Sequence, residues 1–227
     1  SSVPSCTWPV IFSSRMMSGL LACFAGVFSA DAAQKGLSLL AGREGEAIAS
    51  PLLTILDDPH YTGSLEATPF DDEGVPTYTK TVVEKGVLRT LLYDLKSAAK
   101  AGVASTGNGR RAGFAGDVNV APFTFYISAG TDSLEAVMGK AGKAIYITEL
   151  KGMHAGLSPV TGDFSLESKG YLVEGGKVVR PAEQFTVAGN LFTMLTDIGA
   201  LADDFMLDGG VGTPGMLFKS LSFAWQG

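Results

Sequence analysis

Short runs of β-branched and aromatic residues, separated by glycine-rich turns, mark the second half of the chain. Four such runs lie at 145–148, 170–173, 177–179 and 185–188. Runs of this composition are typical of strands. Glu174-Gly175-Gly176 lies between the second and third runs, and glycine there supplies the positive φ that a tight hairpin turn requires. The pattern predicts strands that brace a long glycine-rich loop at 152–162.

The first half contains a second predicted hairpin. Residues 79–83 and 87–92 are rich in Val, Thr and Leu, and Glu84-Lys85-Gly86 lies between them as a turn. Further strand-like runs are found at 9–12, 52–56, 123–127 and 216–224. The polar, glycine-rich segment 105–116 has neither strand nor helix periodicity, so a mobile loop is expected there.

Helical spacing of apolar residues occurs in one long segment near the N-terminus. After Ser13 or Ser14, either of which suits an N-cap, apolar side chains recur at helical spacing to about Ala33. Shorter helices are predicted after three further caps: Asp94, Asp132 or Ser133, and Asn190, the last helix running to Ala202. Strands with interspersed helices in no regular βαβ order predict an α+β fold of mostly antiparallel sheets.

Composition and charge narrow the classes of function. The chain has 227 residues, 46% hydrophobic and 18% charged, which is ordinary for a globular protein. Its net charge is −6 and no block of Lys and Arg occurs, which disfavours direct binding to nucleic acid. The two cysteines, Cys6 and Cys23, form neither a CxxC pair nor a disulfide framework, so a cytoplasmic location is expected.

The apolar run at 16–30 has two alternative interpretations besides a core helix. It falls short of the roughly 18–20 residues that a bilayer span needs, so no membrane association is expected. With Arg15 before it and Ser29-Ala30-Asp31-Ala32 after it, the run also has features of a signal peptide. The upstream segment 6–12 does not suit such a leader, which favours the core helix.

Several motifs, in order along the chain, carry a family resemblance. The most specific are Ser158-Pro159-Val160-Thr161-Gly162-Asp163-Phe164-Ser165 and Ala188-Gly189-Asn190, preceded by Thr68-Pro69-Phe70-Asp71 and Ser105-Thr106-Gly107-Asn108. Together they resemble the C-terminal half of the TldD/PmbA family, and the PmbA branch more closely. That family is described as peptidases and, by an older name, as modulators of DNA gyrase. The resemblance implies that residues 1–227 are the C-terminal region of a longer protein, with a separate N-terminal domain absent from this chain.

The resemblance also implies where a catalytic metal would be found. The peptidase branch carries His-Glu-x-x-x-His on a helix, where the two histidines hold zinc and the Glu beside the first activates water. The matching positions in this chain are Gly19, Leu20 and Cys23, and residues 208–215 lack the additional cysteine ligand of the family. We therefore expect no metal and no other cofactor, and Cys23 is interpreted as a buried, unreactive thiol with a vestigial ligand as the alternative.

The glycine-rich loop contains the first candidates for a site. Thr161, Gly162 and Asp163 lie in the most recognisable motif and are predicted to meet a substrate or a partner. His154 in the same loop is a second candidate. The alternative is structural: the Asp163 side chain bonds backbone amides and only fixes the loop.

Arg110 and Arg111 are further candidates for substrate binding. They follow Ser105-Thr106-Gly107-Asn108-Gly109, which lacks the Lys-Ser/Thr ending of a phosphate-binding P-loop. Their guanidinium groups suit bidentate pairing with a peptide carboxylate. The alternative is a solvated loop without a ligand.

Two acidic clusters favour turns over metal sites. Asp57-Asp58-Pro59-His60 and Asp71-Asp72-Glu73 each precede or contain turn-forming residues, and Asp side chains commonly bond the backbone of such turns. The same reasoning assigns Asp203-Asp204 to a helix end.

These observations lead to one principal hypothesis and two alternatives. The principal one is a peptidase-family subunit without a zinc site of its own, which binds a peptide or unfolded protein for maturation or degradation. The resemblance implies a homo-oligomer or a hetero-oligomer with a TldD-like protein. The alternatives are a non-catalytic peptide-binding or scaffold protein, and an enzyme that uses an unrecognised non-metal site.

Overall fold

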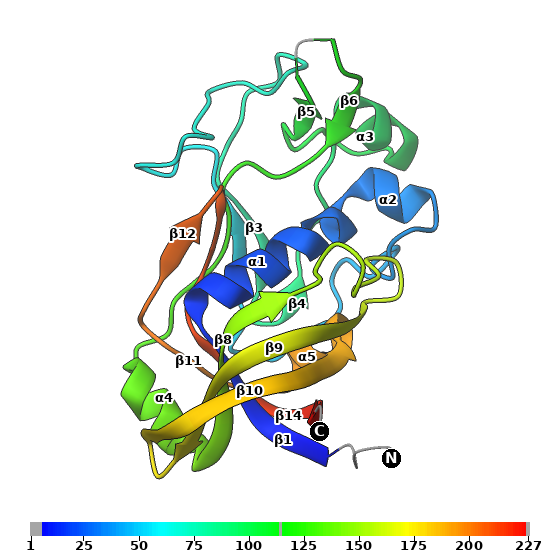
Figure 1. The fold of residues 1–227 in the computed structure, drawn as a ribbon. Coiled ribbons are helices and arrows are strands. Elements are labelled where there is room, and N and C mark those ends of the chain that lie inside the picture. The colour runs from blue at the N-terminus through cyan, green and yellow to red at the C-terminus, as the bar shows by residue number, and fades with distance from the viewer. Residues whose placement is uncertain (1–5, 114, 226–227) are drawn as a thin grey trace.

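The longest strands form a sheet that closes on itself in the computed structural model, which describes residues 6–113 and 115–225 (Figure 1). Each strand of the ring pairs with the next in the order β1, β8, β9, β10 and β14, and β14 pairs again with β1. The bounds are β1 (Cys6–Phe12), β8 (Lys143–Lys151), β9 (Asp163–Glu174), β10 (Lys177–Asn190) and β14 (Met216–Trp225). The pairs are antiparallel except β1 with β8.

The alternation of side chains explains why these strands close around a core. In β9, Phe164 and Leu166 are buried whereas Ser165 and Glu167 are exposed, which is the period of two expected of a strand with one covered face. The predicted hairpin turn at Gly175-Gly176 is confirmed, and both glycines have positive φ. The strands around it are longer than predicted, because β10 continues through the run at 185–188.

A second sheet lies above the closed sheet in Figure 1. Its order is β12, β13, β7, β2, β3 and β4, and β13 pairs in parallel with β7 while the other pairs are antiparallel. The bounds are β12 (Met206–Asp208), β13 (Val211–Thr213), β7 (Phe125–Ile127), β2 (Ile55–Asp57), β3 (Lys80–Glu84) and β4 (Val87–Leu88). The predicted hairpin with its turn at Lys85-Gly86 is thus confirmed. A small hairpin of β5 (Gly109–Arg111) and β6 (Val118–Val120) lies at the top of the molecule.

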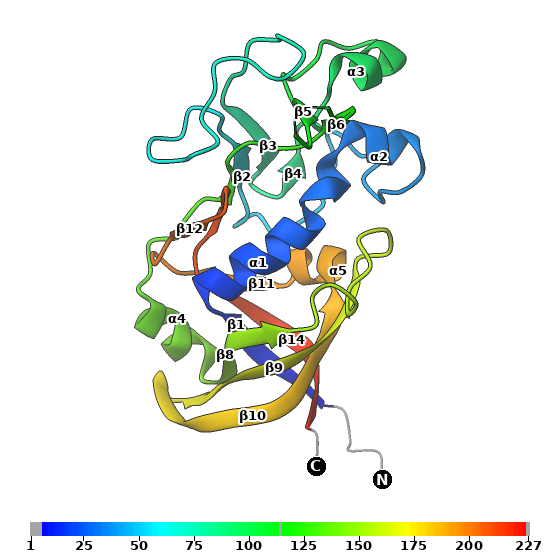
Figure 2. The same cartoon turned by 45° about the horizontal axis from the view of Figure 1, so that its top comes forward.

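Helix α1 (Ser14–Phe24) crosses between the two sheets (Figure 2). The Ser13 side chain caps it as predicted, accepting a hydrogen bond from the Met16 amide. The helix does not run unbroken to Ala33. It passes into a 3-10 turn, η1 (Ala25–Phe28), and Ser29 then caps a separate short helix, α2 (Ala30–Gln34). The helix is interrupted where the Ala30 amide donates a hydrogen bond to Leu92 O, which lies outside the helix.

Two of the three other predicted helices have the predicted caps and ends. Helix α3 (Leu95–Ala101) begins after Asp94 and ends at Gly102, which is left-handed, and α4 (Leu134–Ala141) begins after Ser133. The last prediction is wrong in extent. Asn190 caps α5 (Leu191–Thr196), but residues 198–201 form strand β11 (Ile198–Leu201), which pairs with β14. Pairing with a buried strand outweighs helical spacing there.

One hydrophobic core extends through both sheets and is joined by α1. Val10, Leu20, Phe125 and Phe218 all belong to it, and a smaller cluster under α4 includes Ile11 and Val137. The predicted α+β class with mostly antiparallel sheets is confirmed. Within the described residues, no helix is both long enough and apolar enough to cross a membrane.

Candidate functional site: the α1 face and the loops around it

The loop between β8 and β9 is fixed by Asn190 at the start of α5. The Asn190 side-chain Nδ2 donates to Thr161 O and to Asp163 Oδ1, both at 2.8 Å. Asn190 Oδ1 accepts from the Phe192 and Thr193 amides. These bonds join Thr161 and Asp163 to the start of α5. The sequence identifies Asn190 only as a helix cap.

Gly162 has the conformation and the space that only glycine tolerates. Its φ is +82°, and a Cβ atom there would lie 2.6 Å from Cδ2 of Phe192. Its carbonyl accepts from the Leu191 amide. Gly162 thus packs the loop directly onto α5.

The Asp163 carboxylate is stabilised in its charged form. Hydrogen bonds from the Asn190 side chain and then from Thr161 lower its pKa, against a small opposing effect of burial. Asp163 is exposed, so its charge remains available to a ligand while its position is set by Asn190. The Asp163 carboxylate accepts from the Asn190 side chain and not from the backbone amides that the structural alternative names.

His154 and Met153 lie in the same loop with different surroundings. His154 is exposed, and its ring makes no hydrogen bond to another described residue. Met153 packs toward α1, where its Cε lies 3.5 Å from the place that a Cβ on Gly19 would occupy. The loop therefore lies over the face of α1 that carries Gly19.

Arg110 and Arg111 are not part of this loop surface. They lie in β5, at the top of the molecule, away from the β8–β9 loop (Figure 2). Arg110 already pairs with Glu66 at 2.5 Å, donates to Pro122 O and stacks on the Phe123 ring. Arg111 is exposed and donates to Gly116 O. Of the two, only Arg111 presents a cation without a carboxylate partner among the described side chains.

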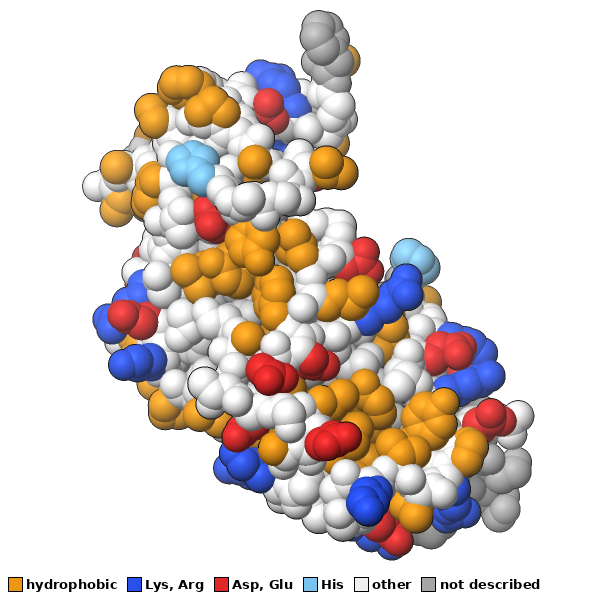
Figure 3. All heavy atoms as spheres, turned by 90° about the vertical axis from the view of Figure 1, so that its left-hand side faces the viewer, with side chains coloured by type: hydrophobic (Ala, Val, Ile, Leu, Met, Phe, Trp, Pro, Cys, Tyr) orange, Lys and Arg blue, Asp and Glu red, His pale blue; other side chains and the backbone are white. Residues whose placement is uncertain are grey.

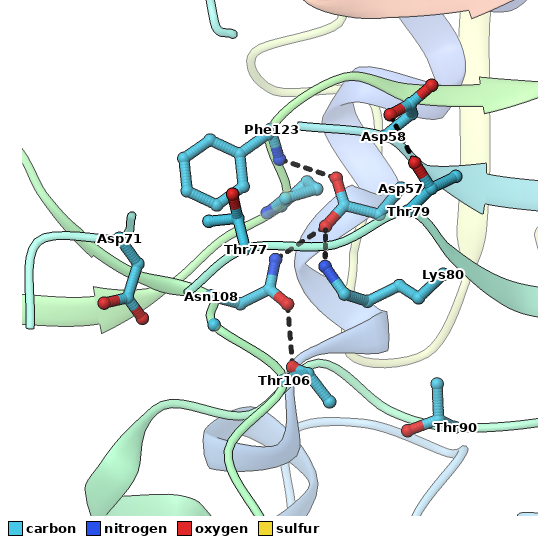
Figure 4. Close-up of polar contacts among 12 residues, drawn as sticks. Asp57, Asp58, Asp71, Thr77, Thr79, Lys80, Thr90, Thr106, Asn108 and Phe123 are labelled. Carbon is cyan, nitrogen blue, oxygen red and sulfur yellow. Dashed lines mark hydrogen bonds and ion pairs between the residues drawn. The ribbon is translucent and has the colours of Figure 1, made fainter. Parts of the chain in front are cut away.

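The segment before these arginines is not the mobile loop that its composition predicts. Thr106 and Asn108 are buried, and they belong to a polar network around Asp57 and Lys80 (Figure 4). Asp57 Oδ2 accepts from Lys80 Nζ at 3.0 Å and from Asn108 Nδ2 at 2.7 Å, and Asp57 Oδ1 accepts from the Phe123 amide.

Sequence reasoning does not find this network because its members are far apart along the chain. Local patterns place Asp57 in a turn and Lys80 in a strand, with nothing to join them. The one local signal is that Lys80 shares a strand face with buried Val82, a position where an unpaired charge is costly. The turn assignments are confirmed for Asp58 and Asp71, since Asp58 Oδ1 accepts from the His60 amide and Asp71 Oδ1 accepts from the Glu73 and Val75 amides. The assignment is wrong for Asp57, which is buried at the end of β2.

The residues of α1 do not fit a zinc ion. Gly19 has no side chain and Leu20 is fully buried in the core. The match to Cys23 is wrong by one residue, because a His-Glu-x-x-x-His motif that begins at Gly19 places its second histidine at Phe24, so none of its three positions carries a metal ligand. Burial raises the pKa of the Cys23 thiol, which disfavours the thiolate that binds metal. Across residues 6–113 and 115–225, no three His, Cys, Asp or Glu side chains gather in a way that could hold a metal ion.

Strands β12 and β13 flank the same helix. Thr213 Oγ1 donates to Ser14 O at 2.8 Å and lies 3.1 Å from Ser18 Oγ, which ties β13 to α1. Strand β12 is the terminal strand of its sheet, and no described strand pairs with its outer side. The α1 face thus lies between an open strand edge and the β8–β9 loop.

A cavity of about 450 Å³ adjoins Asn190 on the side of α5. Most of its lining residues are polar and uncharged, with Thr193, Ser220 and Ser222 among the contributors and Asp197 as the one ionisable residue.

The side of the molecule that carries β12 is shown in Figure 3. Hydrophobic side chains gather in two neighbouring areas of this surface, with carboxylates at their borders. Met206 in β12 is 40% exposed.

Comparison with known proteins assigns the chain to a family. Residues 5–225 match the model of the PmbA/TldA metallopeptidase C-terminal domain. A metalloprotease PmbA homolog from Haemophilus influenzae is 32% identical over 216 residues, which cover 95% of this chain and 46% of that protein.

Solved structures agree in fold. The crystal structure of a proposed modulator of a DNA gyrase from Thermotoga maritima has a TM-score of 0.92 and 37% identity, covering 99% of this chain and 51% of that one. TldE from Thermococcus kodakarensis has a TM-score of 0.88 and 31% identity, covering 97% and 50%. The chain spans about half the length of these relatives. The chain belongs to the PmbA/TldD family, and its match is to the C-terminal domain of that family.

Proposed function

We propose that this chain is the C-terminal region of a longer PmbA/TldD-family protein that works as a peptidase subunit without a zinc site of its own. Its role is to hold a peptide or an unfolded protein segment during maturation or degradation. The observation that carries the proposal is the chemistry of α1, where Gly19 and fully buried Leu20 stand at the positions of a metal-binding histidine and a catalytic glutamate.

Peptide binding is supported by the open edge of β12. An extended peptide adds a strand to such an edge through main-chain hydrogen bonds, and alternate side chains then enter neighbouring pockets. The edge lies beside α1, so a peptide bound there passes the face on which the family carries its chemistry. The β8–β9 loop with His154, Thr161, Gly162 and Asp163 adds a second contact for the peptide or for a partner. Arg111 is the more suitable of the two arginines for a carboxylate.

The proposed partner is a zinc-bearing TldD-like protein in a hetero-oligomer, with a homo-oligomer as the alternative assembly. The partner supplies the metal chemistry that α1 does not. Direct contact with nucleic acid is not part of the proposal, since the net charge is −6. Two free cysteines support a reducing compartment, and we place the protein in the cytoplasm.

Cleavage of an unstructured peptide by a mixture tests the proposal. A zinc-bearing TldD-like protein is assayed alone and with a stoichiometric amount of the full-length protein that contains this chain. We expect faster cleavage by the mixture, and metal analysis of the purified partner-free protein should give no bound zinc.

Two results would favour one of the alternative functions. Equal rates with and without the protein favour the non-catalytic scaffold, for which the same replaced ligand positions are the supporting observation. Cleavage by the purified protein alone in the presence of a chelator favours an enzyme with a non-metal site.

A further inference from the structure

Three aromatic rings form a half-exposed cluster on the second sheet. Tyr61 comes from the loop after β2, Tyr126 from β7, and Phe205 from the residue before β12. The ring centroids lie 5.3 Å apart for Tyr61 and Tyr126, 5.8 Å for Tyr126 and Phe205, and 6.3 Å for Tyr61 and Phe205. We call these residues the aromatic triad.

The triad lies on the sheet face opposite α1. Thr213 in β13 points toward α1, as its contact with Ser18 shows, so the preceding residue Gly212 faces the other way. A Cβ atom on Gly212 would overlap with Cζ of Phe205. Glycine at this position therefore lets the Phe205 ring lie on β13 and reach Tyr126, which neighbours Gly212 across the sheet.

A carboxylate without a cationic partner lies beside the triad. The Asp58 amide donates to Thr124 O at 2.8 Å, two residues before Tyr126, and the Asp58 carbonyl accepts from the Tyr61 amide at 3.3 Å. Burial and then the charge of Asp58 raise the pKa of Tyr126. Asp58 Oδ1 accepts from Thr79 Oγ1 at 2.7 Å and from the His60 amide at 2.9 Å. Its Oδ2 has no partner among the residues that the structure describes, and no Lys or Arg of that part of the chain pairs with it. In Figure 4 the Asp58 side chain points away from the buried Asp57 network.

Aromatic faces and an uncompensated carboxylate together select a cation. The negative face of a ring attracts an ammonium or guanidinium group, and a nearby carboxylate adds charge attraction. A neutral apolar side chain would gain only the ring contact, and an acidic one would be repelled by Asp58. Exposed Asp203, two residues before Phe205, adds another negative charge without an ion-pair partner in the described chain.

The triad is also continuous with the open edge of β12. Phe205 immediately precedes Met206, the first residue of that strand. A peptide that extends the sheet at β12 therefore brings one of its side chains to the Phe205 ring.

We propose that the aromatic triad and Asp58 bind a lysine or arginine side chain of a peptide whose backbone pairs with the open edge of β12. The inference rests on the proposed function and deepens it by naming the class of substrate, which is basic peptides.

Three matched peptides test the inference. A short labelled peptide with lysine at its centre is compared with versions that carry norleucine or glutamate there, and binding to the unchanged protein is measured by fluorescence anisotropy. Norleucine keeps the aliphatic stem and removes the charge. We expect the lysine peptide to bind about tenfold more tightly than the norleucine peptide, as desolvated cation–π contacts allow, and the glutamate peptide to bind least.

Two variants of the protein test whether Asp58 and the aromatic triad cause the preference for the lysine peptide. Asp58→Asn keeps an acceptor for Thr79 and the His60 amide but removes the charge, and Phe205→Leu removes a ring. Each should reduce the preference for lysine to about twofold or less. Tyr171→Leu, which removes an exposed ring on β9, is the matched control and should leave the preference unchanged. Circular dichroism confirms that each variant is folded.

The outcomes separate this inference from the function on which it rests. If the lysine and norleucine peptides bind equally well to the unchanged protein, the triad has no role in selecting cations, while peptide binding stands. If none of the peptides binds, the proposed function is wrong and this site is wrong with it. A lysine preference that survives in both folded variants assigns the cation to another surface and overturns the inference.

Discussion

At the residue scale, Gly162 combines two constraints that each favour glycine. Its φ of +82° lies in the left-handed region, and Phe192 occupies the space where a Cβ would project. Gly152, in the same loop, has a φ of +78°, but no heavy atom lies within 4 Å of the place that its Cβ would occupy. A comparison of substitutions at Gly152 and Gly162 therefore distinguishes the effect of backbone strain from that of steric overlap.

We expect Gly162→Ala to lower the free energy of unfolding more than Gly152→Ala does. Both variants lose about 1–2 kcal/mol because a side chain is placed at left-handed φ. Gly162→Ala also pushes Phe192 from its place, which adds about 1–3 kcal/mol. Urea unfolding monitored by circular dichroism measures both values. Equal losses in the two variants would show that the contact with Phe192 does not hold the loop on α5.

At the element scale, α1 is a core helix. Met17, Leu20, Leu21 and Phe24 are buried against both sheets, whereas Ala22 is exposed. The spacing of apolar residues in the sequence places Leu20 and Phe24 on this face correctly.

We expect Leu20→Glu to reduce the free energy of unfolding by about 4 kcal/mol or more, because it removes a buried apolar side chain and buries a carboxyl group. Ala22→Glu on the exposed face of the same helix is the control, with an expected change within about 0.5 kcal/mol. Thermal and denaturant unfolding give both values. A Leu20→Glu variant as stable as the control would mean that α1 can accommodate the family motif without rearrangement.

At the scale of the whole molecule, the Asp57 network joins segments that are distant in sequence. Asp57 ends β2, Lys80 begins β3, and Asn108 and Phe123 lie on the loops beyond. Both charged side chains are almost fully buried, at 0% and 3% exposure for Asp57 and Lys80. The network therefore holds the upper loops, including the one that leads to Tyr61, onto the second sheet.

We expect Lys80→Met to cost about 3–5 kcal/mol of stability, because it leaves the buried Asp57 charge without its cation. Lys35→Met, which breaks the exposed pair with Asp31 on α2, is the control and should cost at most about 1 kcal/mol. The measurement is equilibrium unfolding in urea. The interpretation fails if Lys80→Met unfolds at the same urea concentration as the control.

Local features of the fold could be predicted from the sequence because they depend on neighbours along the chain. Ser13, Asp94, Ser133 and Asn190 cap helices where predicted, since an N-cap bonds amides two or three residues away. Both hairpin turns follow from their glycines. The extent of the last helix could not be predicted, because β14 draws residues 198–201 into a strand.

The candidate site, too, could be predicted from the sequence only in part. The motif around Thr161, Gly162 and Asp163 can be found in the sequence, and Asn190 can be identified there as a helix cap, but the bonds that join them cannot. The triad of Tyr61, Tyr126 and Phe205 gives no sequence signal, because its members come from three separate elements.

The sequence by itself determined the α+β class, the turns, the caps and the family. Each of these depends on residue type, on spacing within a few residues or on the order of motifs. Only the tertiary structure decided that the long strands close into a ring, that Asp57 meets Lys80 and that an open strand edge lies beside α1. These depend on contacts across many tens of residues, where burial and the pairing of charges, and not local preference, fix which groups meet.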